Sequence, residues 1–203
     1  LLVPMQGACF ILGLDSRREE NLWKIRSSVS MVFQNPENQI VSTVVEDDVA
    51  FGPENLGLPA AEIRRRVDEA LKVCGLAEKA DKAVYTLSGG QKQRLAIAGA
   101  LAMGTRCLVL DEPTAGLDER GRAALLKLLD RIHREGTGIV LITHDLEIAF
   151  SRSDRILVLE HGRCAGLGTA DEIAMRLYRR PVAGLLLPEV MLTALKLRER
   201  GVR

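Results

Sequence analysis

Two short apolar segments constrain the fold of this chain more than any other feature. Residues 107–110 (CLVL) and 139–143 (IVLIT) have the length and composition of buried β-strands. Between them, apolar side chains recur at helical spacing over residues 120–134, and Gly136 would end that helix. Two buried strands joined by a helical crossover form a βαβ unit, in which the strands are parallel and covered on both faces. The sequence therefore predicts an α/β fold.

The composition excludes several classes of function. The 203 residues suit one domain, and 28 Lys and Arg residues balance 27 Asp and Glu residues, so no bulk field attracts nucleic acid or anionic lipid. The longest apolar run, residues 182–187, is far shorter than the ~20 residues that cross a bilayer. The four cysteines have no C-x-x-C spacing, which argues against a zinc site or a disulfide framework. We expect a soluble or peripheral protein without a nucleic-acid partner.

The region before residue 107 is predicted to contain a strand, a polar loop and helices. Residues 29–33 (VSMVF) predict a strand that feeds a polar loop over residues 34–39 (QNPENQ). The apolar stripe over residues 60–76 predicts an amphipathic helix.

A short helix is predicted between that loop and that amphipathic helix. Thr43 and Glu46 have the spacing of a capping box, in which each side chain accepts from the other's backbone N–H. The helix would run to Phe51 and stop at Gly52 and Pro53.

The C-terminal third is predicted to contain a hairpin and two helices. Residues 155–160 and 163–167 would pair around a turn at His161 and Gly162. A capping box at Thr169 would open one helix, and residues 189–200 would form the other.

Polar side chains follow each of the three predicted strands. Gln34 follows the first, Asp111 and Glu112 follow the second, and His144 follows the third. Ligands of open parallel sheets bind outside the carboxyl ends of the strands, so we expect these side chains to converge on one crevice. There Asp111 would hold Mg²⁺ and Glu112 would take a proton from water. Taken singly, the Asp-Glu-Pro sequence also suits a turn, and His144 also suits a structural hydrogen bond.

The segment LSGGQ at residues 87–91 allows two interpretations. Ser88 and Gln91 match a capping box, and glycines before a helix suit a turn. A Ser-Gly-Gly lead into a helix also presents backbone N–H groups at the positive end of the helix dipole, which is a site for phosphate.

The order of these features resembles one family. A strand-end Gln, LSGGQ, a strand with DEP, AGLD at residues 115–118 and a strand-end His follow one another as in the ATPase subunits of ATP-binding-cassette (ABC) transporters, over residues 29–169. The resemblance implies a P-loop NTPase-type core with a mostly parallel sheet and a helical subdomain at residues 43–83, which grips a membrane partner. It also implies one ABC ATPase domain over residues 1–203 with a C-terminal helical tail at residues 169–203.

The same resemblance implies a role for each site residue. Gln34 would sense the metal ion with Asp111, Glu112 would be the catalytic base, and His144 would contact the γ-phosphate of ATP. Asp118 would make a contact across a dimer of ATPase subunits. The signature motif would bind ATP held by the opposite, homologous or identical subunit; its residues are Ser88, Gly89, Gly90 and Gln91.

Three segments carry a closer resemblance, to the ATPases of energy-coupling factor (ECF) transporters, which include cobalt and nickel importers. They are FQNPENQIV at residues 33–41, VEDDVAFGPENLGLP at residues 45–59 and PEVMLTALKLRERG at residues 188–201. This resemblance implies an ATP- and Mg²⁺-dependent subunit at the cytoplasmic face of the membrane. Its partners would be a transmembrane coupling protein and a substrate-capture subunit for a vitamin or metal ion. Another importer class, or an ABC ATPase acting on ribosomes or chromosomes, is the alternative.

One family motif is absent from the sequence. The phosphate-binding loop G-x-x-x-x-G-K-[ST] does not occur, and there is no Gly-Lys pair anywhere in the chain. In the family this loop precedes the region that Leu1 begins, so we expect an N-terminally incomplete ATPase domain; a degenerate subunit is the alternative. The retained Asp111, Glu112 and His144 favour the first interpretation. The chain alone is expected to be inactive as an ATPase.

Overall fold

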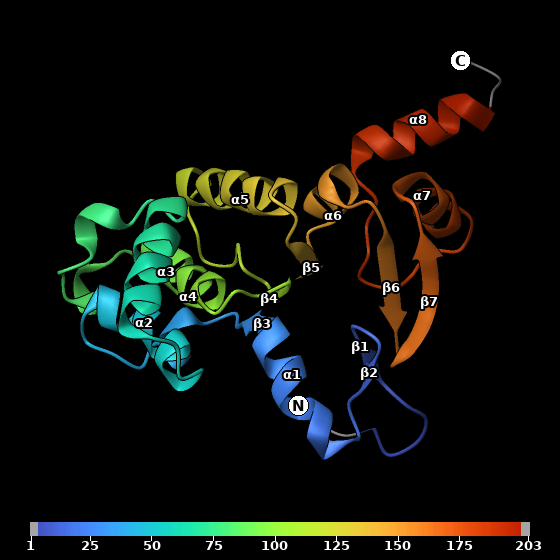
Figure 1. Ribbon diagram of the computed structural model, residues 1–203. Coiled ribbons are helices and arrows are strands. Elements are labelled where there is room, and N and C mark those ends of the chain that lie inside the picture. The colour runs from blue at the N-terminus through green and yellow to red at the C-terminus, as the bar shows by residue number, and fades with distance from the viewer. Residues whose placement is uncertain (1–3, 200–203) are drawn as a thin grey trace. The chain divides into compact units, whose positions relative to one another are not determined.

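The computed structural model describes residues 4–199 and divides into two compact units (Figure 1). The first unit ends at Ile142 and the second begins at Thr143. No helix among the described residues is both long enough and apolar enough to cross a membrane.

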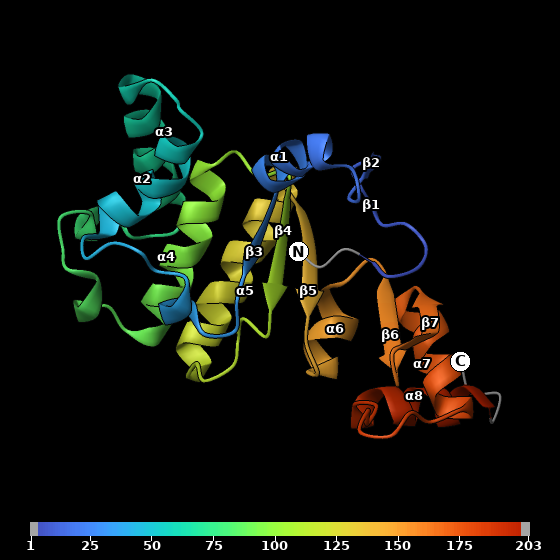
Figure 2. The same cartoon turned by 90° about the horizontal axis from the view of Figure 1, so that it is seen from below.

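A three-stranded parallel sheet forms the centre of the first unit (Figure 2). The strands, in spatial order, are β3 (Val29–Val32), β4 (Cys107–Asp111) and β5 (Gly138–Ile142). Leu110 of β4 lies opposite Val32 on one side and Leu141 on the other. The central strand buries Leu108 and Leu110 completely. The predicted parallel α/β fold is confirmed, but the predicted cover on both faces is wrong, because Val140 and Ile142 of β5 are 49% and 46% exposed.

Helices supply most of the core of this unit. Buried side chains of α2, α3, α4, α5, β3 and β4 form one hydrophobic cluster. Its fully buried members include Val49, Leu95, Ile97 and Leu108. The amphipathic pattern correctly predicted α3, which buries Val67 and Leu71 against that cluster. The helices are α1 (Glu19–Ser28), α2 (Val45–Asn55), α3 (Ala60–Val73), α4 (Gly89–Ala102) and α5 (Glu119–Arg134).

Several short elements of this unit were not predicted from the sequence. Helix α1 buries only Ile25 and leaves Trp23 exposed, so it carries no apolar stripe that a periodicity argument could detect. The others are the hairpin strands β1 (Phe10–Ile11) and β2 (Leu14–Asp15) and the 3₁₀ turns η1 (Pro36–Asn38), η2 (Ala77–Lys79) and η3 (Val84–Thr86).

The start and the end of α2 were both predicted wrongly. Val44 is its N-cap and makes no side-chain cap, while the carbonyl of Thr43 accepts a hydrogen bond from the N–H of Val84 at 2.8 Å. That pairing holds Thr43 in an extended segment, so it cannot open the helix. The helix also continues through Gly52 and Pro53, because it packs closely on α4: a Cβ at Gly52 would lie 2.6 Å from Cγ of Met103.

Up to residue 199, the second unit contains an antiparallel hairpin and three helices. His161 and Gly162 both have positive φ, 48° and 73°, as a tight two-residue turn requires, so the predicted hairpin is confirmed. The predicted capping box is also present, between Thr169 and Glu172. Buried side chains of β6, α7 and α8 form the core of this unit. The elements are α6 (Leu146–Arg152), β6 (Ile156–Glu160), β7 (Arg163–Gly168), α7 (Ala170–Arg179) and α8 (Glu189–Glu199).

Helix α8 corresponds to the helix predicted at residues 189–200, of which residue 200 lies outside the described part of the chain. Helix α6 was not predicted. It has 7 residues, about two turns, and Ile148 is its buried residue, so it offers too short a pattern for a periodicity argument.

The buried carboxylate of Asp48 generates a test of this packing. Its Oδ1 accepts hydrogen bonds from the backbone N–H groups of Val41 and Ser42 at 2.8 and 3.0 Å. Asp48→Ala would leave both donors unpaired and should lower the free energy of unfolding by about 1–3 kcal/mol. Urea unfolding of the chain measures this change.

Asp48→Asn is the matched variant, because its amide oxygen keeps one acceptor in place. It should lose clearly less stability than Asp48→Ala. Equal losses in the two variants would show that these two hydrogen bonds are not what Asp48 contributes.

Candidate functional site

Asp111 and Glu112 stand where the central strand of the sheet ends. Asp111 is the last residue of β4 and is partly buried. Glu112 has φ of 44°, in the left-handed region, and its N–H donates to the carbonyl of Ile142 at 2.9 Å. A side chain other than glycine adopts this conformation at a cost, and such residues cluster at functional sites. The end of β5 therefore fixes the backbone that carries the Glu112 carboxylate.

Gln34 lies beyond the carboxyl end of the neighbouring strand. Val32 ends β3 opposite Leu110, and Gln34 follows two positions later with an exposed side chain. Parallel pairing thus places Gln34, Asp111 and Glu112 at the same edge of one sheet, as the sequence predicts.

The loop that carries Gln34 is closed by a residue that the sequence analysis missed. The side-chain carbonyl of Gln39 accepts from the N–H of Phe33 at 3.2 Å, and its amide donates to the carbonyl of Met31 at 3.0 Å. This one side chain therefore binds the backbone on both sides of the end of β3. The polar string QNPENQ contained the residue, but no sequence rule separates a loop-closing Gln from a solvated one.

The signature segment caps a helix without using the N–H groups of its two glycines. Ser88 is the N-cap of α4; the N–H of Ser88 donates to Oε1 of Gln91 at 2.9 Å, and the N–H of Gln91 donates to Oγ of Ser88 at 3.4 Å. The predicted capping box is therefore confirmed. It uses the N–H groups of Ser88 and Gln91 and not those of Gly89 and Gly90, which lie in the first turn, where a helix has no internal acceptor for them. The capping and anion-binding interpretations are thus compatible.

The N-termini of α4 and α5 lie next to each other. A Cβ at Gly90 would lie 3.7 Å from Cδ2 of Leu117 and 3.8 Å from Cα of Gly121. Asp118 is the N-cap of α5, and its Oδ1 accepts from the N–H of Gly121 at 2.8 Å. The structure therefore brings the signature motif beside the loop of Asp118.

His144 belongs to the second unit, two positions after β5 ends. The next residue, Asp145, is the N-cap of α6 and accepts from the N–H of Ile148 at 3.1 Å. The convergence of His144 with Asp111 and Glu112 stays a prediction from the sequence.

The acidic residues at this edge fit a magnesium site of the kind that shares its ligands with a substrate. No group of three or more His, Cys, Asp or Glu side chains within residues 4–199 is placed to enclose a metal ion. Mg²⁺ commonly takes one or two protein oxygen ligands and completes its shell with water and phosphate oxygens. One carboxylate at Asp111 with the amide oxygen of Gln34 would suit such an ion.

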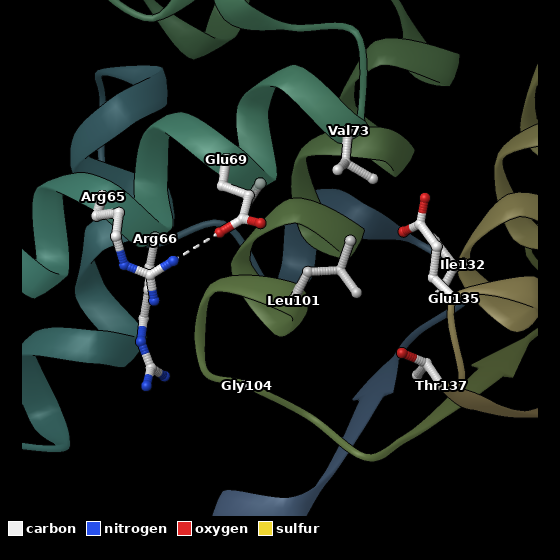
Figure 3. Close-up of a pocket in the computed structure, with 10 residues that line it drawn as sticks. Arg65, Arg66, Glu69, Val73, Leu101, Gly104, Ile132, Glu135 and Thr137 are labelled. Atoms are coloured by element: carbon white, nitrogen blue, oxygen red, sulfur yellow. Dashed lines mark hydrogen bonds and ion pairs between the residues drawn. The ribbon is translucent and has the colours of Figure 1, made fainter.

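A hollow of about 320 Å³ lies elsewhere in the first unit (Figure 3). Gly104 and Thr137, which line it, precede β4 and β5, so this hollow lies at the amino edge of the sheet. Arg65 and Glu69, one turn apart on α3, form an ion pair at 3.0 Å beside it. The hollow is therefore separate from the candidate site, which lies at the carboxyl edge.

A second hollow, of about 250 Å³, lies between the Gln34 loop and the segments that flank α2 and α4. Tyr85 on its rim is 84% exposed, which is unusual for a large aromatic side chain. We refer to this as the docking hollow; its lining residues are Glu37, Ile40, Ser42, Thr43, Val84, Tyr85 and Lys92.

Comparisons with known proteins agree with one another. The family model described as "ABC transporter" matches residues 1–115. The energy-coupling factor transporter ATP-binding protein EcfA1 of Symbiobacterium thermophilum is 53% identical over 100% of this chain and 70% of its own length. EcfA1 of Clostridium perfringens is 47% identical over 100% of this chain and 72% of its own length. EcfA2 of Symbiobacterium thermophilum is 45% identical over 99% of this chain and 70% of its own length.

Two solved structures have the same fold. One is cbiO1 from Clostridium perfringens, described as part of the ABC transporter complex cbiONQ, with a TM-score of 0.80 and 38% identity over 96% of this chain and 78% of that one. The other is the ATP-binding cassette MJ0796, a dimer in a post-hydrolysis state bound to ADP and Pi, with a TM-score of 0.70 and 29% identity over 83% of this chain and 75% of that one.

The backbone of Glu112 generates a test of its strain. Glu112→Gly should be more stable than Glu112→Ala by about 1 kcal/mol, because only glycine adopts the left-handed region without a Cβ clash. Chemical denaturation of both variants of the chain measures the difference.

Glu69 supplies the matched control, because it lies within α3 with ordinary helical neighbours. There the order should reverse, with Glu69→Gly less stable than Glu69→Ala by about 1 kcal/mol. The same order at both positions would contradict the strained conformation at Glu112.

Proposed function

The chain belongs to the ABC transporter family, in the group of energy-coupling factor transporter ATP-binding proteins, and from this premise we propose that it powers a membrane importer of a vitamin or a metal ion such as cobalt or nickel. Members of this family bind and hydrolyse ATP. The observation that carries the proposal is the placement of Gln34, Asp111 and Glu112 at the carboxyl edge of one parallel sheet.

In the proposed reaction each of these side chains acts on ATP or on the attacking water. Asp111 and Gln34 would hold Mg²⁺, which neutralises charge on the phosphate oxygens. Glu112 would accept the proton of the water that attacks the γ-phosphate. The hydrogen bond from its N–H to Ile142 supports this role, because it fixes the backbone that orients the Glu112 carboxylate toward the attacking water. His144 would donate a hydrogen bond to the γ-phosphate.

The signature motif would complete the ATP site of a second, homologous or identical subunit. Ser88 and Gly89 are exposed at the N-terminus of α4, so a phosphate bound to another subunit could approach them. Asp118 would contact the partner subunit from the adjacent loop. The dimeric state described for MJ0796 supports this arrangement.

We further propose that residues 43–83 form a helical subdomain that holds the importer's transmembrane coupling protein. In support, α2 and α3 pack on α4, and the docking hollow lies beside them with Tyr85 exposed on its rim. A substrate-capture membrane subunit would complete the complex at the cytoplasmic face of the membrane. A single ABC ATPase domain without the phosphate-binding loop would span residues 1–203 and include this subdomain, with residues 169–203 as a C-terminal tail that carries α7 and α8.

The absence of a Gly-Lys-Ser/Thr sequence leads to a prediction for these 203 residues alone. They lack the loop that donates N–H groups and a lysine to the β- and γ-phosphates, so ATP hydrolysis should stay at background. A phosphate-release assay on the purified chain measures this. Turnover that Glu112→Gln abolishes would contradict the prediction.

The base role of Glu112 is tested in the full-length natural protein assembled with its membrane partners. Glu112→Gln should lower ATP turnover by a factor of about 10² to 10⁴ while ATP still binds, because the amide cannot accept the proton. Filter binding of ATP and phosphate release are measured on the same preparation.

The matched control is Glu119→Gln, since Glu119 is an acidic residue in the first turn of α5. It should hydrolyse ATP at close to the wild-type rate. Normal turnover in Glu112→Gln would remove Glu112 from the base role.

A further inference from the structure

An ion pair joins the Gln34 loop to the signature helix. Nζ of Lys92 donates to Oε1 of Glu37, and the two residues are 55 positions apart in the sequence. The side chain of Lys92 is only 18% exposed, while that of Glu37 is 61% exposed. The hydrogen bond from Lys92, together with its charge, lowers the pKa of the Glu37 carboxyl.

Each partner of this pair lies close in the sequence to a residue of the proposed ATP machinery. Glu37 lies three positions after Gln34, in η1, where its N–H donates to Oδ1 of Asn35 at 3.0 Å. Lys92 follows Gln91 directly, and its N–H donates to the carbonyl of Ser88 at 2.9 Å. A displacement of the loop would therefore act on the first turn of α4 through this ion pair.

The partly buried position of Lys92 makes this contact more than a surface pair. A solvated ion pair contributes little, because water screens it and either side chain can leave. A lysine side chain that is mostly covered by protein has fewer alternative positions than an exposed one, so it loses less side-chain entropy when the pair forms. The first turn of α4 and η1 are thus held together by electrostatics as well as by packing.

From these contacts we infer that Glu37 and Lys92 are positioning residues that hold the Gln34 loop at a fixed position relative to the signature helix, α4. The inference rests on the proposed function, which assigns the loop to one ATP site and the helix to another. Both residues also line the docking hollow with Ile40, Thr43 and Tyr85. A segment of the proposed transmembrane coupling protein seated in that hollow would contact both residues of the ion pair and shift them together. The pair therefore transmits occupation of the hollow to Gln34 and to the signature motif.

The test compares ATP hydrolysis by the full-length protein in its membrane complex with hydrolysis by the same protein without its membrane partners. Glu37→Gln and Lys92→Gln should each reduce the stimulation by the partners about threefold to thirtyfold, the range expected for loss of one coupling contact. The rate without partners should stay within about twofold of wild type, since neither residue is proposed to contact ATP, Mg²⁺ or the attacking water. The double variant with the charges exchanged, Glu37→Lys with Lys92→Glu, should recover most of the stimulation.

A second measurement needs no ATP hydrolysis. In the 203-residue chain, amide hydrogen exchange over residues 35–40 should become faster in Lys92→Gln, because η1 loses its contact with α4. Lys82→Gln is the control, since Lys82 lies in the segment between α3 and α4 and forms an exposed ion pair with its neighbour Asp81. It should change neither the exchange nor the stimulation.

The two proposals fail in different ways. A wild-type complex that hydrolyses no ATP would overturn the proposed function. A complex that hydrolyses ATP and keeps full stimulation in both single variants, or that the charge exchange does not rescue, would overturn the link alone. Unchanged exchange over residues 35–40 in Lys92→Gln would also overturn it.

Discussion

The parallel pairing of β4 between β3 and β5 is the constraint on which the first unit depends. This central strand is paired on both sides and buries Leu108 and Leu110 completely on one face, while Cys107 and Val109 on the other face are partly exposed. Along its length the strand is apolar, and its first charged residue comes where it ends. The position of Asp111 and Glu112 is therefore a consequence of the core, and the chemistry of the site begins at the residue where burial stops.

The sequence predicts the parts of this structure that local rules control. The apolar runs predict the three parallel strands, Ser88 and Thr169 predict two capping boxes, and His161 with Gly162 predicts a turn. Each depends on a few neighbouring residues, so a single chain carries the whole signal. The resemblance to ABC ATPases rests on the order of such motifs, and the matches to energy-coupling factor ATPases confirm it.

Contacts between distant residues account for what the sequence did not predict. Thr43 has the right spacing for a cap, but Val84 binds its carbonyl across the chain. Helix α2 survives Pro53 because Gly52 lets it approach α4. In the sequence, Gln39 and Glu37 look like ordinary loop residues. Their partners, Met31 and Lys92, come close to them only in the folded chain. The sequence therefore predicts the site residues that directly follow strands. It does not predict the residues that hold them in place, such as Gln39 and Glu37.

The close approach of α4 and α5 at Gly90 sets two partial positive charges side by side, since each helix begins there. Two like poles at contact distance repel each other, and Asp118 offsets only the one at its own helix. An anion that arrives at Gly89 and Gly90 would remove this repulsion as well as form hydrogen bonds. Phosphate would then act on the protein as a counterion that draws two helix ends together, and its departure would let them relax apart.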